Sequence, residues 1–97
     1  MADGLQDQTA ELLAELVRFN TVNPPGNERE AIEHLERYLD SAGFHTEVLG
    51  ASDERPNLVA TLAADGDAGG PTLLYLGHVD TVLADPAEWT HDPWSGE

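Results

Sequence analysis

The residues best suited to chemistry are His78 and Asp80, which follow a short apolar run at residues 73–76. Side chains alternate between the two faces of a strand, so in an extended chain these two point the same way. A neutral imidazole can bind a divalent metal, and a carboxylate that holds its other ring N–H fixes the tautomer. The spacing also fits an ordinary hydrogen-bonded pair at a strand end. One ligand is not a site, because zinc normally takes three or four protein ligands.

The other histidines and the tryptophans favour structural roles. His34 lies off the apolar stripe of a predicted helix, and His45 lies on the polar face of a predicted strand, so both are expected at the surface. His91 is close to the His-x-Asp pair in sequence and could approach a substrate, but it is not expected to be a metal ligand. Trp89 and Trp94 are expected to pack the C-terminal loop onto the domain, since aromatic side chains mostly contribute burial.

Two predicted helices precede this pair. Apolar residues at three- and four-residue spacing predict a helix over residues 5–20, which must end before Asn-Pro-Pro-Gly at 23–26. A second helix is predicted to begin at Asn27, an N-cap residue with Glu30 three positions later, as in a capping box. Gly43 suits the left-handed position that ends a helix.

Three strands are expected after the helices. Residues 44–49 alternate in polarity, residues 57–63 are richer in apolar side chains, and residues 72–76 form the apolar run typical of a strand buried on both faces. Residues 50–56 and 65–71 are expected to be surface loops. Two helices followed by strands predict an α/β or α+β arrangement. The sheet is expected to be incomplete, because a strand buried on both faces needs neighbours and covering helices.

The composition narrows the classes of function. Nineteen acidic residues against four arginines give a formal net charge of −15, so nucleic acid and anionic membranes should repel the chain. The absence of cysteine excludes disulfides, thiol nucleophiles and Cys-bound zinc. No signal sequence is recognisable, and no apolar run approaches the roughly 20 residues of a membrane span. A cytoplasmic protein is therefore expected.

The context of His78 resembles the first metal-site motif of the M20 metallopeptidase family. Gly-His-Val-Asp-Thr-Val at residues 77–82 is followed by Trp89 and by Asp-Pro-Trp-Ser-Gly at 92–96. The family pattern is Gly-His-x-Asp-x-Val-Pro, then a Trp, then an Asp-Pro-Phe-like element. Upstream, Asn-Thr-Val-Asn-Pro-Pro-Gly-Asn-Glu at residues 20–28 is similar to the turn between the first two helices of that family. Two matches in the right order are more specific than either alone.

The resemblance covers residues 5–97 and implies the fold and the site. Residues 1–97 would be the amino-terminal part of a zinc-peptidase-like, three-layer α/β catalytic domain, without the lid or dimerisation domain. His78 would ligate one of two divalent metal ions, zinc or else cobalt or manganese. Asp80 would orient that histidine and count as catalytic. The bridging aspartate, the general-base glutamate and the other ligands would lie beyond Glu97.

Two departures from the family pattern leave the substrate subgroup open. Leu83 stands where the family commonly has proline, and Trp94 stands where phenylalanine is commoner. The resemblance implies hydrolysis of an amide or peptide bond in a small N-acyl amino acid or short peptide. The full-length parent could be a homodimer, and the 97-residue chain alone is expected to be inactive. The alternative is a non-enzymatic acidic interaction module, or a degenerate relative, because the chain supplies only one ligand.

Overall fold

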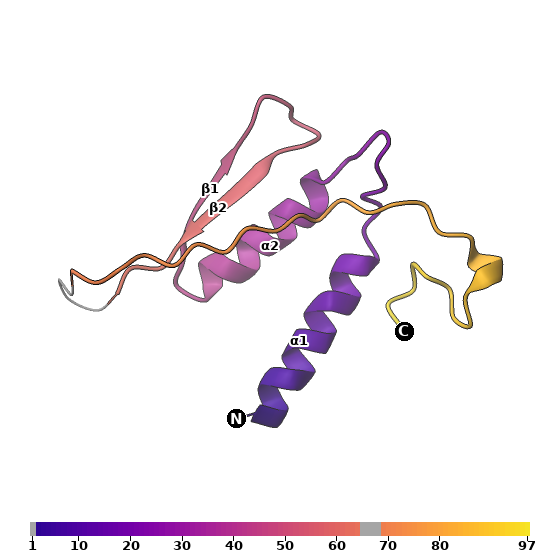
Figure 1. Ribbon diagram of the computed structural model, residues 1–97, viewed down its shortest axis with the longest axis horizontal. Helices are drawn as coiled ribbons and strands as arrows, with labels where there is room; N and C mark the ends of the chain where they lie inside the picture. The colour runs from indigo at the N-terminus through magenta and orange to yellow at the C-terminus, as the bar shows by residue number, and fades with distance from the viewer. Residues whose placement is uncertain (1, 65–68) are drawn as a thin grey trace.

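The computed structural model describes residues 2–64 and 69–97, which form two helices, a two-stranded hairpin and a long extended segment (Figure 1). Helix α1 spans Ala2–Val17 and helix α2 spans Arg29–Ser41. Strand β1, His45–Leu49, pairs antiparallel with β2, Asn57–Thr61. A single 3₁₀ turn, η1, spans Pro86–Glu88 within the described C-terminal loop. This is an α/β fragment, in agreement with the predicted class.

Helix α2 packs against the hairpin, and its C-terminal end is the predicted one. It buries Ala31 and Ile32. Gly43 follows the helix with φ +96°, and its N–H donates to the carbonyl of Asp40. This left-handed position costs glycine little, so the chain can turn directly into β1.

The predicted N-cap of α2 is wrong. The residue before the helix is Glu28, not Asn27, and no side chain caps the first turn. The Glu28 carbonyl accepts from the N–H of Ile32 at 2.8 Å, as a helix-starting residue does. Its carboxylate turns away from the helix toward Arg55, at 3.1 Å. A long-range ion pair therefore replaces the local capping box that Asn27 and Glu30 predicted.

Helix α1 has the predicted length but lies three residues nearer the N-terminus, and it is only partly covered. It ends at Val17, three residues before the predicted end, and Leu13 remains 62% exposed. Its contact with α2 includes His34, whose Nε2 lies 2.7 Å from a carboxylate oxygen of Glu15 and whose ring lies 5.5 Å from that of Phe19. The expected surface position of His34 is therefore only partly correct, since its side chain is 27% exposed but also links the two helices. No helix within the described ranges is long and apolar enough to cross a membrane.

The hairpin shows the alternation predicted from sequence. Thr46 and Val48 are half-buried, whereas His45, Glu47 and Leu49 are exposed. β2 shows the same alternation and ends two residues before the predicted 63. One face of the hairpin is therefore turned toward α2, as period-two patterning requires.

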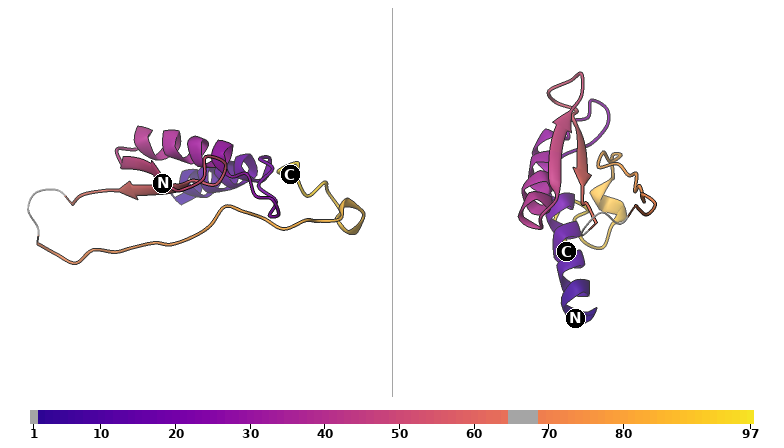
Figure 2. Two further views of the ribbon diagram at one scale, coloured as in Figure 1. Left: turned by 90° about the horizontal axis from the view of Figure 1, so that it is seen from above. Right: turned by 90° about the vertical axis from the view of Figure 1, so that its left-hand side faces the viewer.

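The third predicted strand does not form in the part of the chain that the structure describes. Residues 72–76 run extended without a strand partner, and Leu76 is 95% exposed. Figure 2 shows this segment passing along one side of the molecule outside the two-stranded sheet. A strand meant to be buried on both faces needs neighbours, and only two strands are present in the described residues. Most of the predicted 65–71 loop lies outside the described residues, while residues 69–71 are exposed.

Burial is concentrated where the 20–28 turn meets the start of α2. The described residues that are buried belong to this turn, to the first turn of α2 and to the end of the 50–56 loop. They are Thr21, Gly26, Glu28, Ala31, Ile32 and Pro56. The best-packed region is therefore the one that carries the first of the two sequence motifs.

Candidate metal centre

The two sequence motifs lie against each other. Val22 and Thr81 form an isolated parallel bridge. The Asn23 N–H donates to the Thr81 carbonyl at 2.8 Å, and the Thr81 N–H donates to the Thr21 carbonyl at 3.0 Å. The buried Thr21 hydroxyl donates to the Val79 carbonyl at 2.8 Å. The turn therefore fixes the backbone around Asp80, although residues 72–76 have no strand partner.

His78 and Asp80 meet as the strand alternation predicted. Nδ1 of His78 lies 2.8 Å from Oδ1 of Asp80 and 3.1 Å from the Asp80 carbonyl oxygen. Both oxygens can only accept, so Nδ1 carries the proton in this contact and the lone pair of the neutral ring is on Nε2. The His78 side chain is 82% exposed, and Nε2 has no hydrogen-bond partner among the described residues. The ring is thus held from one side and open on the other.

Asp80 is held by the turn through its second oxygen. Oδ2 accepts from the Asn23 side-chain amide at 3.1 Å and lies 3.6 Å from Nη2 of Arg55. The hydrogen bond from Asn23 lowers the pKa of Asp80 most, and the hydrogen bond from His78 lowers it further. Partial burial of the carboxylate acts in the opposite direction. Asp80 therefore stays ionised and keeps accepting from the His78 ring.

Arg55 is held in turn by Glu28. Its Nε lies 3.1 and 3.2 Å from the two carboxylate oxygens, and its Nη2 lies 3.1 Å from Oε1. The Glu28 side chain is only 7% exposed. The hydrogen bond to Glu28 and the negative charge of Glu28 raise the pKa of Arg55 above its ordinary value. Glu28, Arg55, Asp80 and His78 thus form a continuous chain of contacts.

The sequence does not indicate the residues that hold Asp80, which are Asn23 and the Glu28–Arg55 pair. Asn23 and Glu28 belong to the 20–28 motif, but that motif indicates only a turn between two helices. Arg55 lies 27 residues after Glu28, and no periodic pattern links the two. Its one sequence signal is that it is among only four cations in a strongly acidic chain.

A groove opens beside the site. It has a volume of about 980 Å³ and runs between β2 with its preceding loop and residues 76–80. Leu58, Val59 and Leu76 supply apolar wall, and the Glu28–Arg55 pair and His78–Asp80 supply the polar part. A small molecule could therefore reach the open side of the His78 ring.

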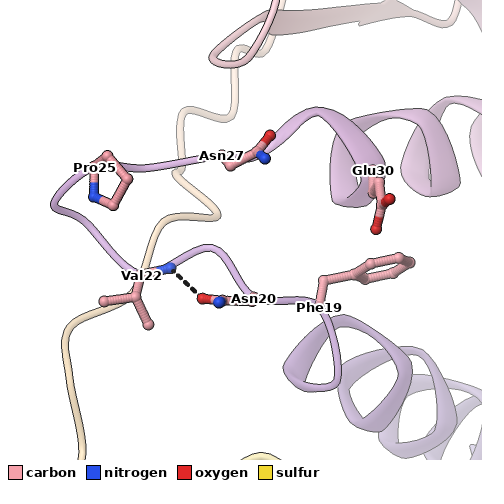
Figure 3. Close-up of a pocket in the computed structure, with 6 residues that line it drawn as sticks. All are labelled: Phe19, Asn20, Val22, Pro25, Asn27 and Glu30. Carbon is pink, nitrogen blue, oxygen red and sulfur yellow. Dashed lines mark hydrogen bonds between the residues drawn. The ribbon is translucent and has the colours of Figure 1, made fainter.

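A smaller cavity of about 290 Å³ lies where the end of α1 meets the 20–28 turn (Figure 3). Here the Val22 N–H donates to the Asn20 side chain at 3.3 Å. The Glu30 side chain points toward the ring of Phe19. Neither His78 nor Asp80 lines this cavity, so it is separate from the candidate metal site.

The remaining predicted residues lie apart from His78. His45 lies 3.4 Å from Glu47 at the surface, as expected, and His91 pairs with Glu97 at 2.9 Å. The expected packing role of Trp89 is wrong, since this residue is 57% exposed. It follows η1, which lies away from the two helices (Figure 1). Trp94 is half-buried beside the 20–28 turn. Within residues 2–64 and 69–97, no three His, Asp or Glu side chains gather into a group that could hold a metal ion.

Curated relatives cover most of this chain. It is 36% identical over 89 residues to the succinyl-diaminopimelate desuccinylase of Xanthobacter autotrophicus, which is 88% of this chain and 22% of the relative. The desuccinylase of Methylorubrum populi is 36% identical over 95 residues, 96% of this chain and 24% of the relative. The acetylornithine deacetylase of Pasteurella multocida is 44% identical over 68 residues, 68% of this chain and 17% of the relative. The chain belongs to the M20 family.

This M20 chain spans about a fifth of the length of the curated relatives it matches. No family model and no solved structure matches it. The two motifs that carry the resemblance to M20 enzymes, residues 20–28 and 77–82, are the two segments that the Val22–Thr81 bridge joins.

Proposed function

We propose that the chain is the amino-terminal part of a metal-dependent M20 hydrolase that cleaves an amide bond in a small N-acyl amino acid or a short peptide. The observation that carries the proposal is the His78–Asp80 contact of 2.8 Å, with Nε2 facing solvent. A ligating histidine almost always donates its other ring N–H to a carboxylate, a backbone carbonyl or water. His78 has a carboxylate and a carbonyl oxygen within 3.1 Å of the same nitrogen.

The residues present fit one ligand of a divalent metal site. His78 would hold the metal through Nε2, and Asp80 would fix the ring orientation and raise the basicity of that nitrogen. When bound, a pair of zinc ions lowers the pKa of bound water toward about 7 and polarises the scissile carbonyl; cobalt or manganese could replace zinc. The further ligands and the general base would come from outside this segment.

The proposed substrate class follows from the relatives. Their names describe the removal of a succinyl or an acetyl group from an amino acid derivative. The groove beside His78 offers both apolar wall and charged groups, as such a substrate requires. We further propose a cytoplasmic protein that dimerises in its full-length form and binds neither nucleic acid nor membranes, given the net charge of −15.

The test uses the full-length protein, stripped of metal with a chelator and reloaded with zinc. His78→Ala should lower kcat/KM for N-succinyl and N-acetyl amino acids by at least about 100-fold and reduce the bound metal. His45→Ala is the matched control, because His45 also lies beside a carboxylate but remote from the site. Undiminished metal content and activity in His78→Ala would overturn the proposed role of His78. A wild-type protein that neither binds zinc nor hydrolyses these substrates would instead favour a non-enzymatic acidic module.

A further inference from the structure

We propose that Arg55 is a positioning residue of this site, joining the buried carboxylate of Glu28 to Asp80 and so keeping Asp80 directed at the His78 ring. The inference rests on the proposed function, because it assigns Arg55 a role in a metal site. Arg55 would touch neither metal nor substrate and would act through Asp80 alone.

The geometry fixes the guanidinium before it reaches Asp80. Three contacts of 3.1–3.2 Å join Nε and Nη2 of Arg55 to Glu28. A planar guanidinium held in this way has little freedom to rotate. Its Nη2 then lies 3.6 Å from Oδ2 of Asp80. Oδ1 of the same carboxylate is left to accept from His78 at 2.8 Å, so Arg55 and His78 use different oxygens of Asp80.

The turn is shaped to seat this guanidinium. Gly26 has φ +73°, and a Cβ built there would lie 2.6 Å from Nε of Arg55 and 2.7 Å from Oε1 of Glu28. The Glu28 N–H donates to the Glu54 carbonyl at 2.9 Å, which ties the 50–56 loop to the turn beside Arg55. Glycine at this position therefore leaves the space that the Glu28–Arg55 pair occupies.

A purely structural role for Arg55 is the competing explanation. Glu28 is 6% exposed, and a buried carboxylate needs a paired cation whatever else that cation does. The two roles differ in one respect. If Arg55 only neutralises Glu28, then removing both charges should restore the protein completely. If Arg55 also positions Asp80, removing both charges should restore stability but not metal binding.

The same loop offers a matched control. Arg29 pairs with Asp53 at 3.9 Å, and the side chains of the two are 38% and 99% exposed. This pair joins the start of α2 to the 50–56 loop, as the Glu28–Arg55 pair does, but Arg29 has no contact with Asp80 among the described residues. Arg29→Met therefore removes a cation from the same region without touching the proposed chain of contacts.

The experiment measures the zinc dissociation constant, by chelator competition, and the thermal unfolding midpoint of the full-length protein. Arg55→Met should weaken zinc binding about tenfold, the lower end of what loss of an outer partner costs, and should lower the midpoint. Glu28→Gln with Arg55→Met should recover the midpoint while zinc binding stays about tenfold weaker. Arg55→Lys should recover part of the affinity, since it keeps the charge without the planar fork. Arg29→Met should leave zinc binding unchanged.

Zinc affinity at the wild-type value in Arg55→Met, or restored in the double variant, would overturn the positioning role. His78→Ala separates this failure from failure of the proposed function. If His78→Ala loses zinc while the Arg55 variants keep it, only the positioning inference is wrong. If His78→Ala keeps its zinc, the proposed metal site itself is wrong.

Discussion

At the scale of single residues, the two carboxylate oxygens of Asp80 have different partners. Oδ1 accepts from the His78 ring, and Oδ2 accepts from Asn23 and faces Arg55. A carboxylate free to rotate would lose part of its hold on the ring. The contacts on Oδ2 therefore bear on the His78 tautomer, although they do not touch the ring.

The pKa of Asp80 depends on the side chain of Asn23. Asn23→Ala should raise the pKa of Asp80 toward its ordinary value, because the Asn23 hydrogen bond is the largest cause of its lowering. A depressed folded-state pKa gives stabilisation that is fully present above about pH 4 and is lost as the pH falls through the folded value. Carboxyl ¹³C titration of the metal-free full-length protein measures this shift.

Asn20→Ala is the control for that titration. Asn20 lies in the same turn and accepts from the Val22 N–H, but it has no contact with Asp80 among the described residues. Its replacement should leave the Asp80 midpoint unchanged. An Asp80 midpoint that Asn23→Ala does not move would show that Asn23 is not what holds Oδ2.

At the scale of elements, the 20–28 turn connects the parts of the site. It forms a bridge to Thr81 through Val22, supplies Asn23 to Asp80 and ends in Glu28, which holds Arg55. Most of the buried residues lie in it or beside it. The turn is therefore a part of the site as well as a connection between α1 and α2.

A glycine comparison tests this description of the turn. Gly26 and Gly43 both have positive φ, but a Cβ on Gly43 would meet nothing within 4 Å. Gly43→Ala should cost about 1–2 kcal/mol from the left-handed backbone alone. Gly26→Ala should cost about 1 kcal/mol more, the lower end of the cost of overpacking, because its Cβ would displace the ends of the Arg55 and Glu28 side chains from their ion pair. Denaturant unfolding of the full-length protein measures both, and equal costs would contradict the crowding at Gly26.

Sequence patterns predicted correctly those features that depend on residues close to each other in the chain. The left-handed Gly43 and the alternation of β1 depend on neighbours a few residues away, and both are present. The start of α2 was predicted wrongly because a partner 27 residues away, Arg55, decides the orientation of Glu28. The His78–Asp80 contact could be predicted, since two residues on one face of an extended chain meet without help from the fold.

At the scale of the whole molecule, the chain is more open than a self-contained domain. Its Cα radius of gyration is 15.9 Å, whereas a compact domain of about 100 residues has about 13 Å. The buried hydrophobic residues among those described are Ala31 and Ile32. The side chains of residues 73–76 are 75–95% exposed on an extended segment. Such an unpaired, extended apolar segment is a template for pairing with another chain.

The isolated 97-residue chain should therefore self-associate. Association should increase with salt, because screening weakens the repulsion between chains of net charge −15. Leu74→Lys with Leu76→Lys should shift the chain toward monomer in analytical ultracentrifugation. Leu5→Lys is the control, since Leu5 is also exposed, at 65%, but lies on α1. Equal association of both variants would exclude residues 73–76 as the cause.

The most direct test of the central claim is anomalous X-ray diffraction from zinc-loaded crystals of the full-length protein. We expect an anomalous peak at about 2.0–2.1 Å from Nε2 of His78, with Nδ1 still hydrogen-bonded to Asp80. Zinc bound elsewhere, with the His78 ring facing solvent and unligated, would contradict it.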